Sequence, residues 1–177
     1  MSETDMEWQP LEPKEEKRTY EIPYQVSSLF IFIVANLSIP LAISQMIEFD
    51  YEWYEHLIKP SFIPPVWFFG QITWIVLDIL IALSGWVVYI EGRFNGVYAL
   101  AYILQAVFHC AWMPVFFAGK QLLIALLDSL LQLLSLVSSI VLYRKVNKWA
   151  SLLLVPALTW VSVAAVFNAA LWYLNQK

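Results

Sequence analysis

Five long apolar segments are the feature that most restricts how this chain can fold. They run over Ser27–Ile47, Val66–Ile90, Val97–Ala118, Leu122–Leu142 and Ser151–Leu174. Each has roughly 20 residues or more, and a helix rising about 1.5 Å per residue then crosses an apolar layer about 30 Å thick. Of the 177 residues, 60% are hydrophobic and only 14% are charged, so too little polar surface remains to cover a water-soluble domain. The sequence therefore predicts an all-α integral membrane bundle of five transmembrane helices.

The first 24 residues differ in composition from everything that follows. They are rich in Glu, Asp and Pro and poor in apolar side chains, and much of the net charge of −4 comes from them. Such a composition is typical of disorder. Residues 1–24 are therefore predicted to be a disordered charged tail, and residues 25–177 one five-helix domain. The short connections between the later apolar segments place successive helices side by side and antiparallel.

Chemistry inside a bilayer depends on the few polar residues, because an unpaired charge or amide there costs several kcal/mol. Those within the apolar segments include Asp78, Gln105, His109, Asp128, Gln132, Thr159, Ser162 and Asn168. They show no His-x-x-x-His or Cys pair for a metal, and no Ser, His and Asp set for hydrolysis. The sequence predicts no metal site and no required cofactor, and the lack of a basic patch argues against a nucleic-acid partner.

Helix three carries a polar and aromatic stripe. Gln105, His109, Trp112 and Phe116 recur at helical spacing and are expected to face the bundle interior. Two interpretations of His109 stay open, a hydrogen bond between helices and contact with a ligand, such as a carboxylate or a haem iron. For Asp78 and Asp128 the competing interpretation is likewise a carboxyl group that ties helices together.

Two tryptophan rows are predicted to line one cavity. Helix two carries Trp67 and Trp74 on one face, and helix five carries Trp160, Ala164, Asn168 and Trp172 at steps of four residues. Trp149 and Trp172 fit an interfacial belt, whereas Trp74 and Trp160 lie deeper, where indole suits stacking on a flat apolar ligand.

The loop before helix two is predicted to be a stiff lid. Its prolines at 60, 64 and 65 fix the backbone, so that Trp53 and Tyr54 can pack across the bundle mouth. A rigid loop with no ligand role is the alternative.

These residues resemble the translocator protein family, also called the TspO or peripheral benzodiazepine receptor family. The resemblance covers roughly residues 27–175. It includes Trp53, Tyr54, Leu57, Lys59, Pro60, Ser61, Phe62, Pro64, Pro65, Trp67, Gly70, Trp74, Gln105, Trp112, Pro114, Phe116, Phe117, Ala125, Leu126, Asp128, Pro156, Trp160, Val161, Ala164, Asn168, Trp172, Leu174 and Asn175. The chain departs from the family pattern at His109, where Asn is usual, and at Asp78, where an aromatic such as Tyr is common.

The resemblance implies a cavity that binds tetrapyrroles (porphyrin and haem) and cholesterol-like sterols, in a carrier or sensor role. The tetrapyrrole would be a ligand rather than a cofactor, with membrane lipid around the bundle and a homodimer left open. The candidate ligand-binding residues are Trp53, Trp67, Trp74, His109, Trp112, Asp128, Trp160, Ala164 and Asn168. Two other readings remain. One is light-dependent oxidative degradation of protoporphyrin by Trp74 and Trp160, and the other is an assembly partner without a small ligand.

A separate sterol-type pattern lies at the carboxyl end of the chain. Leu171, Tyr173 and Lys177 satisfy a cholesterol-type motif, which is a weak pattern by itself. The membrane expected from the resemblance is the mitochondrial outer membrane for a eukaryotic protein and a cell-envelope membrane for a bacterial one.

Overall fold

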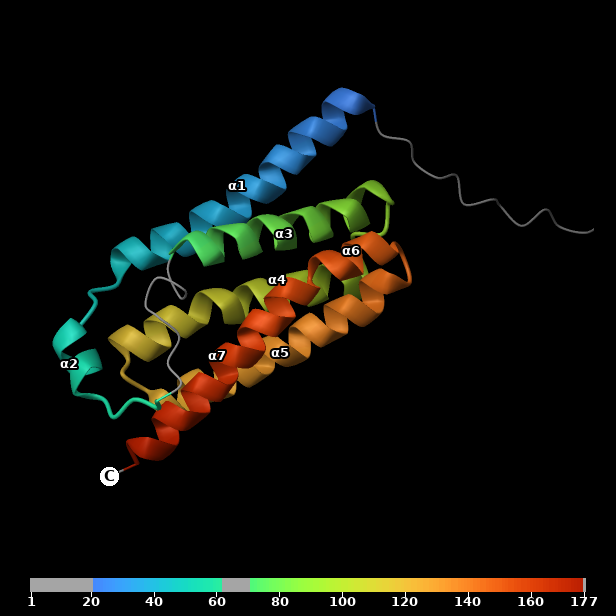
Figure 1. Cartoon of the computed structure of the whole chain (residues 1–177). Coiled ribbons are helices and arrows are strands. Elements are labelled where there is room, and N and C mark those ends of the chain that lie inside the picture. The colour runs from blue at the N-terminus through green and yellow to red at the C-terminus, as the bar shows by residue number, and fades with distance from the viewer. Residues whose placement is uncertain (1–20, 62–70, 177) are drawn as a thin grey trace, which may run out of the picture.

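The computed structural model describes residues 21–61 and 71–176, and within these ranges the regular structure is entirely helical (Figure 1). The elements are α1 (Ile22–Met46), α2 (Tyr51–His56), α3 (Gln71–Ile90), α4 (Gly96–Met113), the π-helical turn η1 (Pro114–Ala118), α5 (Leu122–Arg144), α6 (Lys148–Leu153) and α7 (Val155–Leu174). Five helical stretches, over residues 22–46, 72–90, 96–118, 122–144 and 148–174, are long and apolar enough to cross a membrane. The predicted five-helix membrane bundle is confirmed.

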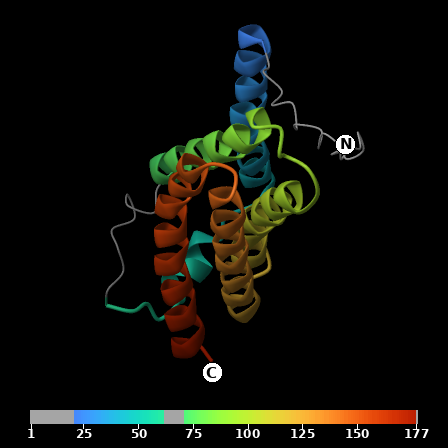
Figure 2. The ribbon, with the colours of Figure 1, turned by 90° about the vertical axis from the view of Figure 1, so that its right-hand side faces the viewer.

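Helix α5 lies between its neighbours α4 and α7, while α1 packs on the outside against α3 and α4. Figures 1 and 2 show α1 at the edge of the bundle, extending past the other helices at its amino end. The buried face of α5 carries Ser129, Ser135 and Ser139, and each hydroxyl donates to a carbonyl of its own helix. Small, internally satisfied side chains allow helices to approach closely inside a membrane.

The helices begin or end at other residues than the predicted apolar segments at several points, and a proline lies near each of them. Helix α1 already begins at Ile22, with Pro23 in its first turn, so the end of the predicted tail is helical. The third segment changes to a π turn at Pro114, where the Gly119 amide donates to the Pro114 carbonyl at 2.8 Å. The last segment begins earlier, at Lys148, and is broken at Leu154, because Pro156 lacks a backbone donor. Residues 1–20, which hold most of the predicted tail, lie outside the described residues.

A close contact joins α1, α3 and α4 away from the loop end of the bundle. A Cβ atom on Gly85 would lie 2.3 Å from Cε2 of Tyr102, so the ring fits only because this position has no side chain. The Tyr102 hydroxyl accepts a hydrogen bond from the Asn36 amide of α1. These contacts fix α3 beside α4, and with it the relative position of the polar residues described below.

Candidate functional site

The two deep tryptophans meet in the middle of the bundle. The ring of Trp74, on α3, lies 6.0 Å from that of Trp160, on α7, with an angle of 88° between the ring planes. The imidazole of His109, on α4, lies 5.1 Å from the Trp74 ring. Trp160 is only 6% exposed. Helices α3, α4 and α7 thus bring their aromatic side chains into one cluster, in which the two predicted tryptophan rows meet at Trp74 and Trp160.

His109 bridges α3 and α5 through its two ring nitrogens. Nε2 lies 3.1 Å from Oδ1 of Asp78, and Nδ1 lies 3.4 Å from Nε2 of Gln132. All three side chains are buried or nearly so, with 7% of the Asp78 and 12% of the His109 side chain exposed. Asp78 follows Trp74 by one helical turn, so this polar contact lies directly beside the aromatic cluster.

Both ring nitrogens of His109 have polar partners in this structure. Nε2 faces the Asp78 carboxyl group and Nδ1 faces the Gln132 amide, so the imidazole links α4 to α3 and α5. The helix-tying interpretation of His109 and Asp78 therefore describes this structure, while the ring face of His109 still borders Trp74.

Several buried polar atoms near this cluster have no hydrogen-bond partner among the described residues. They are Oδ2 of Asp128, Oδ1 of Asn168 and Nε1 of Trp112. The other end of the Asn168 amide donates to Ser129 Oγ at 2.8 Å and so ties α7 to α5. Ala164, one turn before Asn168, is half-buried. Because a buried acceptor without a donor is costly, these oxygens mark places where a ligand donor would be stabilised.

A second aromatic cluster closes the loop end of the bundle. Phe116, 1% exposed, stacks on Trp112 at 4.9 Å and contacts Trp53 at 5.6 Å and Tyr54 at 6.3 Å. Phe117 joins the same cluster. We call these five residues the mouth cluster. Burial, and secondarily the charge of Glu55, raises the pKa of the Tyr54 phenol. Helix α2 is thus docked onto η1 through Trp53 and Tyr54, a contact that both the predicted lid and a rigid loop without a ligand role would make.

Polar contacts fasten the same loop at two further points. The Asn175 side chain accepts from the Ile58 amide at 2.9 Å and donates to the Ile58 carbonyl at 3.0 Å. Lys120 Nζ, between η1 and α5, lies 2.6 Å from Oδ2 of Asp50, whose Oδ1 caps α2 by accepting from the Trp53 amide. Lys120 has a φ of 53°, a left-handed conformation that costs a non-glycine residue about 1 kcal/mol or more.

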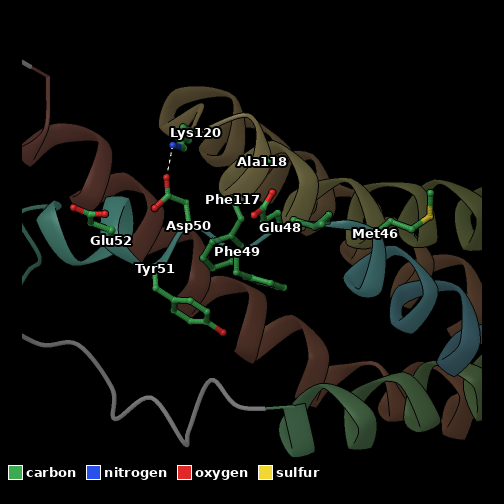
Figure 3. A pocket seen from close by; sticks show the side chains of 10 residues that line it. Met46, Glu48, Phe49, Asp50, Tyr51, Glu52, Phe117, Ala118 and Lys120 are labelled. Carbon is green, nitrogen blue, oxygen red and sulfur yellow. Dashed lines mark hydrogen bonds and ion pairs between the residues drawn. The ribbon is translucent and has the colours of Figure 1, made fainter.

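A pocket of about 660 Å³ opens beside this ion pair. Figure 3 shows the Lys120 side chain in contact with Asp50, with Phe49 and Phe117 close to Asp50 and Glu48. Glu48 and Glu52 line the same pocket, so three carboxylates face one lysine.

The Asp50–Lys120 contact is expected to open in acid. The hydrogen bond from Lys120, followed by that from the Trp53 amide, lowers the pKa of Asp50 below 3.8. A carboxyl group whose pKa is lower in the folded state stabilises that state fully at pH values above its unfolded-state pKa. The stabilisation is lost as the pH falls through the lowered pKa of the folded state. Spin labels on Glu52→Cys and Gln121→Cys, in a Cys110→Ser background, should show a narrow distance distribution at pH 7 that broadens below about pH 3.8.

Lys120→Met is the control for this titration. It should give the broad distribution already at pH 7, with no further change in acid. A distribution that responds to acid in the same way with and without Lys120 would show that the ion pair does not hold the loop.

The remaining predicted residues are not all brought to this site. Trp67 and the prolines at 64 and 65 lie outside the described residues, as does Lys177. Leu171 is fully buried against Phe116 and its neighbours, whereas Tyr173 is 72% exposed. The structure therefore does not place these two members of the sterol-type motif on one face of α7.

Comparison with known proteins now adds to this geometry. Residues 28–174 match the TspO/MBR family. The chain belongs to this family. The "Tryptophan-rich sensory protein" of Cereibacter sphaeroides is 31% identical over 149 residues, which cover 84% of this chain and 92% of the relative. The "Protein CrtK" of Rhodobacter capsulatus is 35% identical over 132 residues, covering 70% and 78%. The human "Translocator protein" is 33% identical over 124 residues, covering 68% and 73%.

The two departures from the TspO/MBR pattern at Asp78 and His109 turn out to contact each other. Each residue stands out from the sequence alone, but their pairing was not predicted. A signal for it existed, because α3 and α4 form an antiparallel hairpin and the two residues lie at nearly equal distances from its turn. Residues so placed are at the same depth in a membrane. No comparable sequence pattern predicts the contacts between Asp50 and Lys120 or between Ile58 and Asn175.

Proposed function

We propose that this TspO/MBR protein binds a flat, largely apolar ligand, a tetrapyrrole or a sterol, inside the bundle beneath the first loop, as a carrier or sensor. The observation that carries the proposal is the meeting of Trp74 and Trp160 in the bundle interior. Indole side chains that protrude from two helices offer a large apolar face to a planar ligand. The names of the relatives, a translocator and a sensory protein, are consistent with such a role.

The loop contributes a gate to this proposal. The mouth cluster and the Asn175 and Asp50 contacts hold α2 over the end of the bundle, so a ligand entering from that side must displace or bend the loop. A gate of this kind is consistent with the position of Trp74 and Trp160 inside the bundle. It is also consistent with a small residue, Ala164, one turn after Trp160 on the same helix. The host membrane follows the source of the protein, mitochondrial outer membrane or cell envelope.

The test is a titration of the detergent-purified protein with protoporphyrin IX in the dark. Saturable tryptophan quenching and a Soret shift are expected. Trp160→Phe, which keeps an aromatic ring but reduces the stacked area, should weaken binding about three- to tenfold. Trp149→Phe is the matched control, because Trp149 is 63% exposed and remote from the cluster, and it should leave the affinity unchanged.

Two further outcomes would change the proposal. Illumination of the complex that yields a new pigment only when Trp160 is present would favour oxidative degradation of the porphyrin over carriage. Unaltered porphyrin affinity in Trp160→Phe and Trp74→Phe alike would show that the tetrapyrrole does not bind at these indoles, and a titration with cholesterol would then decide whether a sterol does.

A further inference from the structure

We infer that the interior site selects a flat ligand that carries a positive charge or an N–H donor edge, and discriminates against one that presents a carboxylate there. The inference deepens the proposed function and rests on it for the location of the site. It is specific to this chain, since it depends on Asp78 and on the contact that this residue makes with His109.

The interior charges are unbalanced. Asp78 and Asp128 are two buried carboxyl groups, 5% and 8% exposed. His109 lies against the first and is close enough to the second to interact with it electrostatically. Within the described parts of the five spans, Lys and Arg occur only at the ends, as Arg144 and Lys148. One imidazole therefore faces two buried carboxyl groups, which a ligand cation or donor would stabilise.

Two buried acceptors in the interior favour a ligand with N–H groups. Asp128 Oδ2 and Asn168 Oδ1 have no donor among the described residues. Asp128 belongs to α5 and Asn168 to α7, the helix that also carries Trp160. A ligand that brings N–H groups would satisfy these oxygens, which a carboxylate cannot do.

Aromatic faces beside a carboxylate form the usual chemical surroundings of a bound organic cation. Trp74 supplies the ring and Asp78, one turn along the same helix, supplies the charge. A cation over an indole face is attracted by the ring, more strongly when it is desolvated, and a nearby carboxyl group adds to this attraction. Nε2 of His109 lies 3.1 Å from Oδ1 of Asp78, which holds this carboxyl group beside the aromatic pair.

The pocket at the loop has the same character. It is lined by Glu48, Asp50 and Glu52 together with Phe49, Tyr51 and Phe117, and Lys120, the one Lys or Arg of this lining, is paired with Asp50 (Figure 3). An acidic, aromatic surface raises the local concentration of cations and lowers that of anions. The loop pocket and the interior therefore favour the same class of ligand.

Two tricyclic probes of nearly the same shape test the inference. 9-Aminoacridine is a cation at neutral pH and anthracene-9-carboxylate is an anion, and both fluoresce. With protein in a non-ionic detergent, saturable binding of 9-aminoacridine is expected to be at least tenfold tighter than that of anthracene-9-carboxylate. Asp78→Asn, which keeps the side-chain size and an acceptor for His109, should weaken 9-aminoacridine about tenfold without weakening the anion.

Glu91→Gln is the matched control. It removes one carboxylate at the far end of the same helix, where Gln can still accept from Asn147, and both probe affinities should stay as in the unaltered protein. Equal loss of both probes in Asp78→Asn would show that Asp78 only maintains the fold, and would overturn the inference. So would a preference for the cation that survives Asp78→Asn unchanged, or the absence of saturable 9-aminoacridine binding.

A parallel titration with protoporphyrin IX tests the proposed function separately from the charge preference. If the porphyrin binds but the tricycles show no Asp78-dependent charge preference, the tetrapyrrole site stands and the cation selectivity is wrong. If the tricycles show the preference and the porphyrin does not bind, the selectivity stands and the tetrapyrrole ligand is wrong.

Discussion

Replacing His109 by leucine is expected to lower the free energy of unfolding by about 3 kcal/mol, because it leaves the Asp78 carboxylate buried without its partner. Hydrogen bonds between membrane helices contribute on average only about 0.6 kcal/mol. The larger figure applies here because the group left behind is a buried carboxyl group without its partner. Leucine fills a volume similar to that of histidine, so cavity formation adds little. The measurement is an equilibrium unfolding titration in mixed detergent, followed by circular dichroism.

The companion variants decide whether the loss comes from the unpaired charge. Asp78→Leu leaves the His109 imidazole without its partner, which costs about 1–3 kcal/mol and therefore no more than the first change. Asp78→Leu with His109→Leu removes both groups, and exchanging a buried pair for apolar side chains is often neutral or stabilising. The double variant is expected to be more stable than His109→Leu alone. Additive losses would show that the two residues do not depend on each other.

The Asp78–His109 pair adds little to the stability of the fold and is expected to matter for the choice of ligand. A buried polar pair is weak evidence for stabilisation, since an apolar pair of the same volume often does at least as well. Its presence beside Trp74 is therefore better explained by what it offers a ligand than by what it adds to the fold. On this argument the double leucine variant should remain folded while it loses the preference for 9-aminoacridine over anthracene-9-carboxylate.

The fold was predictable from the sequence because hydropathy over about 20 residues reports directly on a membrane span. All five spans were found. Their ends were less accurate, because Pro114 and Pro156 permit a π turn and a break that leave the apolar stretch uninterrupted in sequence. Hydropathy alone cannot register either feature.

The site was predictable only in part, for a different reason. Periodicity places Trp74 on one face of its helix and Trp160 on one face of another, and the structure brings the two faces together. Partner choice between polar side chains depends on relative helix depth and rotation, which periodicity within one helix does not contain. Hence Asp78 and His109 were both singled out but not paired, and Lys120 was missed as a partner of Asp50.

Phe116→Ala is expected to detach the loop from the bundle and to lower the free energy of unfolding by about 3–5 kcal/mol. Phe116 is the shared neighbour of Trp53, Tyr54 and Trp112, so its removal opens a cavity at the centre of the mouth cluster. Loss of these ring contacts leaves α2 held mainly by exposed polar bonds, such as those of Asn175, which are weak in water. Hydrogen exchange of the amides of α2 should then become much faster than in the unaltered protein.

Phe30→Ala provides the matched control, because Phe30 is 68% exposed on the outer face of α1 and far from the loop. It deletes the same side chain and should leave exchange in α2 unchanged. Phe116→Ala should also speed both binding and release of protoporphyrin IX, since a gate held shut by aromatic packing slows passage in each direction. Fast exchange in α2 with unaltered porphyrin kinetics would mean that the ligand does not pass the loop, and that entry lies between the helices, from the lipid side.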